Sequence, residues 1–346
     1  MAENQTGVIV RPHQLSKILA KAIPKRLPVL VVGAPGIGKS SVVEQACEAA
    51  GYRLIVCFPA LSDPTEFKGL PWAEAGATRA TFLPYGQLAE AVFATVPTAF
   101  FLDDLGQATP AVQAASMSLI LNREVNGVKI PDHVSFIGAT NRRADRAGVS
   151  GLLEPLKSRF ATIVELQPAP DDWFEWAAAH GINPVLMALL RLKPELLHKF
   201  EPTADLTNSP NPRTWNFASQ WLALDLDDDC LFPAVAGAVG AGAAAEVVGM
   251  IRMMRDLPSP DEILLDPRNA PVPEDPSALY AVASALGYYA TATNFGAVVD
   301  YAKRLPAEYG VLAIRDAQRR DRGICKTNAY MQMVNSDLGK AISGQR

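Results

Sequence analysis

The segment from Gly33 to Ser40 constrains the fold of this chain most. It has the sequence GAPGIGKS, follows the apolar run Val29–Val32 and precedes a segment of helical character over residues 41–50. A strand, a glycine-rich turn and a helix with the pattern GxxxxGK[ST] form a cradle for phosphate groups. The turn's N–H groups and the positive end of the helix dipole face the phosphate oxygens. The sequence therefore predicts a nucleoside triphosphate site with these contact residues: Gly33, Ala34, Pro35, Gly36, Ile37, Gly38, Lys39, Ser40 and Ser41.

Further polar residues at strand ends complete a site for ATP and Mg²⁺. Lys39 is expected to reach the β- and γ-phosphates, and the Ser40 hydroxyl to bind Mg²⁺. An apolar strand over residues 100–102 ends in Asp103 and Asp104. Asp103 is the second predicted metal ligand, and Asp104 lies where an acid polarises the attacking water. A later strand, residues 134–139, is followed by Asn141, whose amide could orient that water.

The first half of the chain alternates strand-like and helix-like segments. This alternation predicts a parallel sheet covered by helices on both faces, with ligands at the carboxyl ends of the strands. We expect five strands, at Val29–Val32, Leu54–Phe58, Ala99–Leu102, Val134–Ala139 and Ile163–Leu166. We expect helices at Leu15–Ala22, Ser41–Ala50, Gln87–Val96 and Ala111–Leu121.

The second half lacks strand signals. We therefore predict an α/β nucleotide-binding core over residues 1–167 and a helical lid with a C-terminal helical extension over 168–346, including a linker-like stretch near 257–276. The small-residue segment Ala234–Met250 is too short to span a bilayer and predicts a tightly packed helix. The first ten residues show no secretory signal.

Composition narrows the function classes. The formal charge of −4 argues against a protein that coats nucleic acid, because neutralising phosphates needs a basic face. The cysteines and histidines are scattered without a zinc-ligand spacing, so we expect no zinc site and a reduced, cytoplasmic setting.

Taken together, the motif order resembles the AAA+ superfamily. The phosphate loop, the acid pair and Asn141 are followed by PLKSRF at residues 155–160 and by PRTW at residues 212–215. Within that superfamily the chain resembles the MoxR-type branch, through residues 63–71 (DPTEFKGLP), 122–131 (NREVNGVKIP) and 141–147 (NRRADRA). The match is dense from about residue 8 to 215 and looser beyond, where it rests on residues 301–309.

This resemblance implies an AAA+ core with a helical lid, and a homo-oligomeric ring, usually a hexamer, with nucleotide at each junction. Lys39, Ser40, Asp103 and Asn141 would act within their own subunit. Arg159 would reach a neighbour's nucleotide as the arginine finger, and Arg213 on the lid would touch its own. Arg146 is a second candidate for an intersubunit contact.

One residue departs from the family's pattern. The acid after the magnesium ligand is usually Glu, and here it is Asp104, one methylene shorter; Gly106 also replaces an Asn that relatives often carry. A base withdrawn by about 1 Å can lose on the order of a hundredfold in rate. We therefore expect slow hydrolysis.

The resemblance also implies a working surface, made of two hairpins at residues 70–83 and 125–130, although both could be ordinary surface hairpins. It implies remodelling, activation or maturation of a protein client, with a von Willebrand factor A domain protein as one candidate. Two alternatives stay open: a slow nucleotide-dependent switch or scaffold, and a DNA-associated motor.

Overall fold

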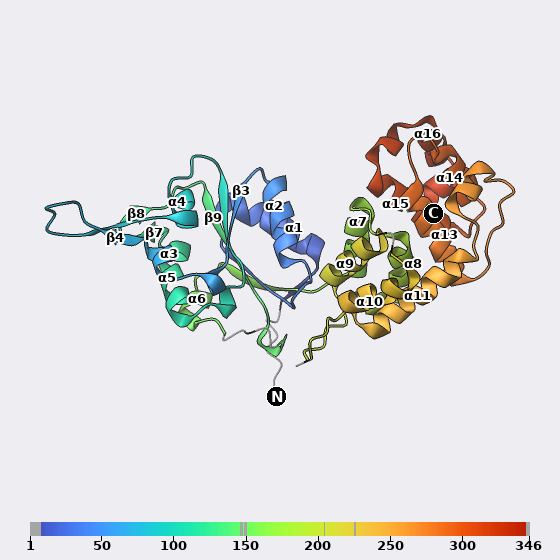
Figure 1. The fold of residues 1–346 in the computed structure, drawn as a ribbon. Helices are drawn as coiled ribbons and strands as arrows, with labels where there is room; N and C mark the ends of the chain where they lie inside the picture. The colour runs from blue at the N-terminus through green and yellow to red at the C-terminus, as the bar shows by residue number, and fades with distance from the viewer. Residues whose placement is uncertain (1–7, 146–147, 149–150, 204, 225, 344–346) are drawn as a thin grey trace. The chain divides into compact units, whose positions relative to one another are not determined.

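The computed structural model describes residues 8–145, 148, 151–203, 205–224 and 226–343. Contacts within the chain divide it into two compact units, Met1–Ala169 and Pro170–Arg346. The first unit is α/β and the second is helical (Figure 1).

Among the described residues of the first unit, six parallel strands form one sheet in the order β1-β10-β2-β9-β6-β3. The strands are β1 (Ile9–Val10), β2 (Val29–Val32), β3 (Arg53–Cys57), β6 (Thr98–Leu102), β9 (Val134–Thr140) and β10 (Thr162–Leu166). The expected count of five is therefore wrong, because β1 adds an edge strand that pairs with β10. A strand of two residues is too short to show the alternation on which strand prediction depends.

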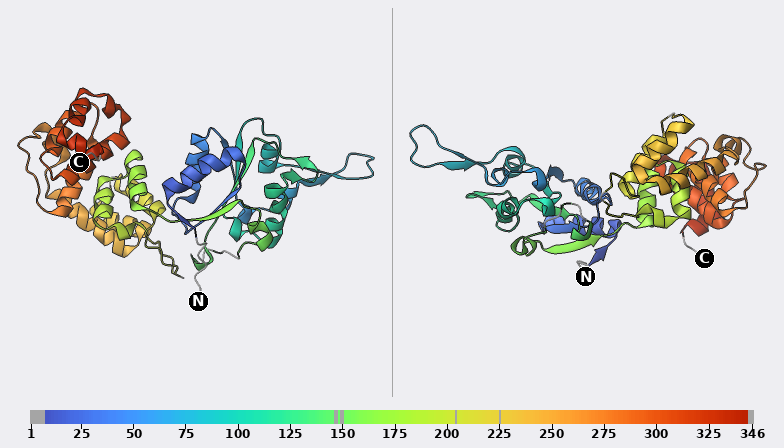
Figure 2. Two further views of the ribbon diagram at one scale, coloured as in Figure 1. Left: turned by 180° about the vertical axis from the view of Figure 1, so that it is seen from behind. Right: turned by 60° about the horizontal axis from the view of Figure 1, so that its bottom comes forward.

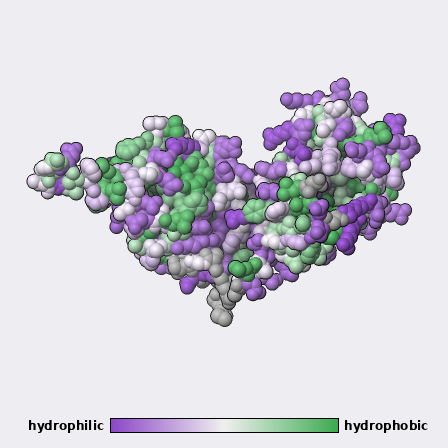
Figure 3. All heavy atoms as spheres, viewed as in Figure 1, coloured by the Kyte–Doolittle hydropathy of each residue, from purple (hydrophilic) through white to green (hydrophobic). Residues whose placement is uncertain are grey.

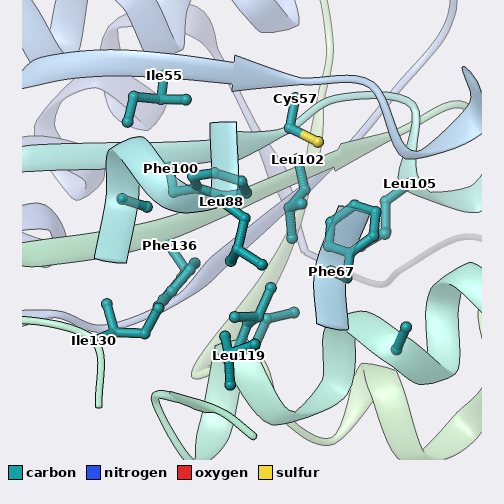
Figure 4. Packing of buried hydrophobic residues seen from close by; sticks show 14 of the residues in the cluster. Ile55, Cys57, Phe67, Leu88, Phe100, Leu102, Leu105, Leu119, Ile130 and Phe136 are labelled. Carbon is teal, nitrogen blue, oxygen red and sulfur yellow. The ribbon is translucent and has the colours of Figure 1, made fainter. Parts of the chain in front are cut away.

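Helices cover both faces of this sheet (Figure 1). They are α1 (Pro12–Ala22), α2 (Lys39–Ala49), α3 (Thr65–Lys68), α4 (Gly86–Val92), α5 (Pro110–Leu121) and α6 (Glu154–Lys157). Leu19 of α1 and Val43 of α2 pack in one core with Val31 of β2. A second core joins the sheet to α3, α4 and α5, and Figure 4 shows Ile55, Phe100 and Phe136 from the strands and Phe67, Leu88 and Leu119 from the helices. Central strands buried on both faces explain why β6 and β9 are mostly apolar along their whole length.

Helix α4 ends earlier than its sequence indicates. The expected helix reached Val96, whereas α4 ends at Val92. Phe93 and Val96 beyond it are exposed, at 67% and 48% of their surface. The apolar residues of this surface loop therefore produced the same sequence pattern as a longer helix with a buried face.

Two antiparallel ribbons extend from the first unit. The first pairs β4 (Leu70–Trp72) with β5 (Thr81–Leu83), and the second pairs β7 (Glu124–Val125) with β8 (Val128–Lys129). Asn126 and Gly127 form the predicted two-residue turn, with φ of 46° and 88°. The β4–β5 ribbon projects from the rest of its unit in each view of Figures 1 and 2.

The second unit consists of helices, with no strand among its described residues. These helices are α7 (Pro170–Ala179), α8 (Pro184–Leu192), α9 (Pro212–Leu222), α10 (Asp228–Val239), α11 (Ala241–Arg255), α12 (Pro260–Leu265), α13 (Pro276–Tyr289), α14 (Phe295–Ala302), α15 (Ala307–Arg320), α16 (Asn328–Val334) and α17 (Asp337–Ser343). One core holds α7–α11 together and a second holds α12–α17. Helix α13 contributes to both cores, through Ala281 to the first and Leu286 to the second.

Two expectations for this unit need correction. The segment Ala234–Met250 is not one helix, because Gly240 separates α10 from α11 with a φ of 83°. The stretch over residues 257–276 contains α12, whose Ile263 is only 1% exposed in the second core. No helix in the described part of the chain combines the length and apolar character needed to cross a membrane.

Candidate nucleotide site

The glycine-rich turn joins the carboxyl end of β2 to the start of α2. Gly36 and Gly38 have φ of 75° and 95°, a region that residues with a side chain rarely adopt. A Cβ at Gly33 would lie 2.9 Å from the carbonyl oxygen of Leu166 and 2.6 Å from Ile37 Cδ1. The glycines are therefore required by the backbone path, and that path opens the N-terminus of α2 toward an anion.

Lys39, the first residue of α2, lies against this turn and is buried, with 7% of its surface exposed. Its Nζ donates to the carbonyl oxygens of Gly33 and Ala34, each at 3.0 Å, and to Oδ1 of Asn141 at 2.6 Å. The structure thus brings together two residues separated by 102 positions in the sequence. Lys39 is held at the mouth of the turn, where an ammonium group can meet phosphate oxygens.

Ser40 and Asp103 meet beside Lys39. Ser40 Oγ donates to Asp103 Oδ2 at 2.6 Å, and Asp103 is 7% exposed. A hydroxyl and a carboxylate fit Mg²⁺, which prefers oxygen ligands and usually keeps several waters and substrate phosphates in its shell. Among the described residues there is no cluster of three or more His, Cys, Asp or Glu side chains that could hold a metal by itself.

Asp104 follows directly and adopts a left-handed backbone conformation, with φ of 55°. Its Oδ1 accepts from Asn141 Nδ2 at 3.1 Å and from Gln107 Nε2 at 2.9 Å. Lys39, Asn141, Asp104 and Gln107 therefore form one continuous chain of hydrogen bonds. The sequence assigned Asn141 and Asp104 to the same attacking water, but it contained no sign of Gln107.

A charged cluster fixes the loop after Asn141. The Arg142 guanidinium donates to the Asp145 carboxylate, at 2.8 Å from Nη2, and to Glu165 Oε1 on β10 at 3.2 Å from Nη1. Both carboxylates are buried. The hydrogen bond to Asp145 is the largest cause that raises the pKa of Arg142 above its ordinary value. Arg142 thus anchors the loop after β9 to β10, the strand on the other side of β2, a role that the sequence motif did not reveal.

Neither Arg159 nor Arg213 makes a hydrogen bond within this network in the described part of the chain. Arg159 follows α6, and its Nη1 donates to the Pro155 carbonyl oxygen at 2.5 Å. Arg213 is exposed in the first turn of α9 in the second unit, where its N–H donates to Asn211 Oδ1 at 3.0 Å. Arg146 lies outside the described residues.

A parallel sheet, a glycine-rich turn that opens onto a helix N-terminus and an acid pair at the end of β6, which β9 separates from β2, define a P-loop nucleotide-binding domain. Comparison of the sequence with models of protein families shows which P-loop domains the chain resembles. Residues 28–160 match the AAA domain of the dynein-related subfamily. The matched segment contains the turn, the acid pair, Asn141 and Arg159, so this part of the first unit is similar to the AAA domains of that subfamily.

Individual relatives cover the chain unevenly. Midasin from Giardia intestinalis is 30% identical over 164 residues, which cover 45% of this chain but only 3% of the relative. A mutant of RuvB from Thermotoga maritima is similar over 80% of this chain and 81% of its own, with 18% identity and a TM-score of 0.41. NtrX from Brucella abortus in complex with ADP matches 94% of this chain and 68% of its own, with 14% identity and a TM-score of 0.35.

Proposed function

We propose that this chain is the subunit of a ring-forming, MoxR-like AAA+ ATPase that hydrolyses ATP and uses it to remodel, activate or mature a protein client. The observation that supports hydrolysis most directly is the hydrogen-bonded chain from Lys39 through Asn141 to Asp104. It connects the residue that would bind phosphate to the acid that would act on water, through one amide side chain.

Each residue of the nucleotide site has a distinct task in the proposed reaction. Lys39 binds the β- and γ-phosphates, and Ser40 with Asp103 holds Mg²⁺, which supplies charge neutralisation at the phosphates. Asp104 polarises the attacking water through its carboxylate, while the Asn141 amide keeps that carboxylate oriented. The amide also accepts from Lys39, so the orientation of the base depends on the phosphate-binding lysine.

Assembly into a ring, which we expect to be a hexamer, is supported by the position of Arg159 and by apolar surface on both units. In the second unit Phe217 and Trp221 of α9 stand one helical turn apart and are 45% and 40% exposed. In the first unit apolar side chains gather on the face that Figure 3 shows. Apolar patches of this kind mark contacts with other protein surfaces, and in the proposed ring those contacts include a second copy of the chain.

The β4–β5 ribbon supports the contact with a client. Leu70, Trp72, Phe82 and Leu83 are 48%, 59%, 44% and 48% exposed, and they occupy both faces of the ribbon. An isolated two-stranded hairpin is at best marginally stable in water. A ribbon that is apolar on both faces and covered on neither is suited to bind another protein.

The second ribbon lies against the base of the first. Asn126 Nδ2, at the β7–β8 turn, donates to the Lys68 carbonyl oxygen at 2.5 Å, directly before β4 begins. Both ribbons thus belong to one surface, which we name the ribbon surface (residues 70–83 and 124–129). Its continuity with β9 through residues 130–133 connects it to the strand that directly precedes Asn141.

A slow switch or scaffold is the main alternative, and the short Asp104 side chain favours it. ATP turnover by the purified full chain separates the two functions. The proposed ATPase requires turnover that Asp104→Asn abolishes while ATP binding persists, and equal turnover in Asp104→Asn and wild type would place the base elsewhere. Stimulation of turnover by DNA would support the DNA-associated motor instead.

Client binding is tested with the same variant. Asp104→Asn with ATP should retain clients, and adding Trp72→Ser and Phe82→Ser should release them without weakening ATP binding. Phe93→Ser, which removes an apolar side chain that is 67% exposed outside the ribbon surface, is the matched control. Equal client capture with and without the two ribbon substitutions would show that the ribbon surface is not the working surface.

A further inference from the structure

Gln107 contacts Asp104 and has no part in the proposed mechanism so far. Asp104 precedes a short 3-10 turn, Leu105–Gln107, and its left-handed φ of 55° directs this turn back over the acid. The Gln107 N–H donates to the Asp104 carbonyl oxygen at 3.0 Å. This hydrogen bond closes the turn and places the Gln107 side chain beside the Asp104 carboxylate.

Two amides meet on a single oxygen of Asp104. Gln107 Nε2 lies 2.9 Å and Asn141 Nδ2 lies 3.1 Å from Oδ1. Among the described residues, no hydrogen bond ends on the other oxygen, Oδ2. The pair of donors therefore fixes the plane of the carboxylate and leaves Oδ2 as the atom that a water molecule can approach.

The oxygen of the Gln107 amide, Oε1, indicates that this placement costs free energy. Gln107 Oε1 is buried and has no hydrogen-bond partner among the described residues. A buried acceptor without a partner is unfavourable, and such groups are uncommon in native structures. The amide cannot simply be reversed, because Oε1, which only accepts, would then face the carboxylate oxygen in place of the donor Nε2.

We propose that Gln107 is a positioning residue that holds the short carboxylate of Asp104 in the reactive orientation. Side-chain length supports this assignment. Asp has one rotatable bond fewer than Glu, so its carboxylate can be fixed from one side by Asn141 and from the other by a residue three positions along the same turn. The inference rests on the proposed ATPase function, since it assigns Gln107 a role through the base of that reaction.

Gln107→Met retains the length and packing of the side chain and removes the donor. We expect turnover to fall about tenfold to a hundredfold, the range that a carboxylate displaced by a fraction of an ångström to about 1 Å produces. The dissociation constant of a fluorescent ATP analogue should stay close to that of wild type, because the Gln107 side chain donates to Asp104 and to no residue of the phosphate loop among the described residues. The melting temperature should also stay close to that of wild type. A purely structural role would lower the melting temperature instead.

A sharper test shortens the side chain at position 107 and lengthens the side chain at position 104. Gln107→Asn shortens the donor by one methylene and should lose turnover as Gln107→Met does. In the Asp104→Glu background the acid is one methylene longer, so Gln107→Asn should cost less than about threefold there. In the Asp104→Asn background, Gln107→Met should cause no further loss.

The outcomes separate this inference from the proposed function. If wild type hydrolyses ATP and Asp104→Asn does not, but Gln107→Met stays within about threefold of wild type, only the role of Gln107 is overturned. The same conclusion follows if Gln107→Asn costs an equal factor in the wild-type and Asp104→Glu backgrounds. Turnover that is absent in wild type, or unchanged in Asp104→Asn, overturns the proposed function itself.

Discussion

Arg159 is predicted to act on the nucleotide of a neighbouring subunit, and the register of the sheet supports this prediction. The Ala161 N–H donates to the Pro28 carbonyl oxygen at 2.8 Å, and Thr162 is level with Val29, the first residue of β2. Arg159 thus lies beyond the amino end of β2, whereas the phosphate loop follows its carboxyl end. Four strand residues at about 3.3 Å each separate these ends by about 13 Å.

An arginine at that distance cannot serve its own phosphate loop without rearrangement of the sheet edge. Arg159→Ala should therefore bind ATP almost as wild type does, because the loop and Lys39 are unchanged. Hydrolysis should fall by about 10³–10⁵, the contribution of an arginine supplied across an interface to phosphoryl transfer. Titration with a fluorescent ATP analogue and steady-state phosphate release measure the two quantities.

Mixed rings test the direction of the contact. Lys39→Ala subunits cannot bind ATP but still present Arg159, while Arg159→Ala subunits have the opposite defect. In an equal mixture with random placement around a head-to-tail ring, about one quarter of the junctions combine an intact loop with an intact Arg159. Phosphate release should recover toward about a quarter of the wild-type rate, at least about a hundredfold above either variant alone.

The control and the refuting result both use the same mixture design. Arg213→Ala mixed with Lys39→Ala should remain inactive, because both residues are assigned to one subunit's nucleotide. Subunit exchange is verified by fluorescence energy transfer between labelled rings. If subunits exchange and the mixture of Arg159→Ala with Lys39→Ala stays inactive, the contact across the junction does not exist.

Three further perturbations have defined outcomes. Lys39→Ala should abolish ATP binding in a fluorescence titration, and an affinity within about tenfold of wild type would refute the phosphate-loop assignment. Arg191→Met leaves the buried Asp316, 2.6 Å from Arg191 in wild type, without its closest cation, and urea unfolding should show a loss of about 3–5 kcal/mol. Burial already raises the pKa of Asp316, so this loss should be smallest at low pH, where the carboxyl is protonated, and should grow as the pH rises. Burial raises the pKa of Cys57 to about 11, so at about pH 8 a thiol reagent should label the exposed Cys230 and spare Cys57 until the protein unfolds.

The sequence predicts most of the core because burial leaves a visible pattern there. Strands β2, β6 and β9 are mostly apolar on both faces, and these apolar runs distinguish them from the helices around them. The pattern fails where length or exposure removes that signal. β1 is two residues long, and Phe93 is apolar yet exposed, so the first was missed and the second was assigned to a helix.

In the candidate site, some residues could be predicted from the sequence and others could not. The residue types and their order predict Lys39, Ser40, Asp103 and Asn141, because phosphate and Mg²⁺ restrict which chemical groups can serve. The contacts of Gln107 could not be predicted, since they depend on the left-handed backbone of Asp104 and on side-chain torsions. No periodicity or composition reports such angles, and only Asn, Asp and Gly adopt them with any frequency.

The hydrogen-bonded chain in the site also determines how its variants must be interpreted. Asn141 accepts from Lys39 through Oδ1 and donates to Asp104 through Nδ2, so one amide orientation satisfies both bonds. Replacing Lys39 therefore removes a phosphate ligand and also releases the amide that orients the base. Residues that share partners in this way have non-additive effects. A loss of turnover in any single variant consequently measures the whole connection from phosphate loop to base, and only double variants divide it among the residues.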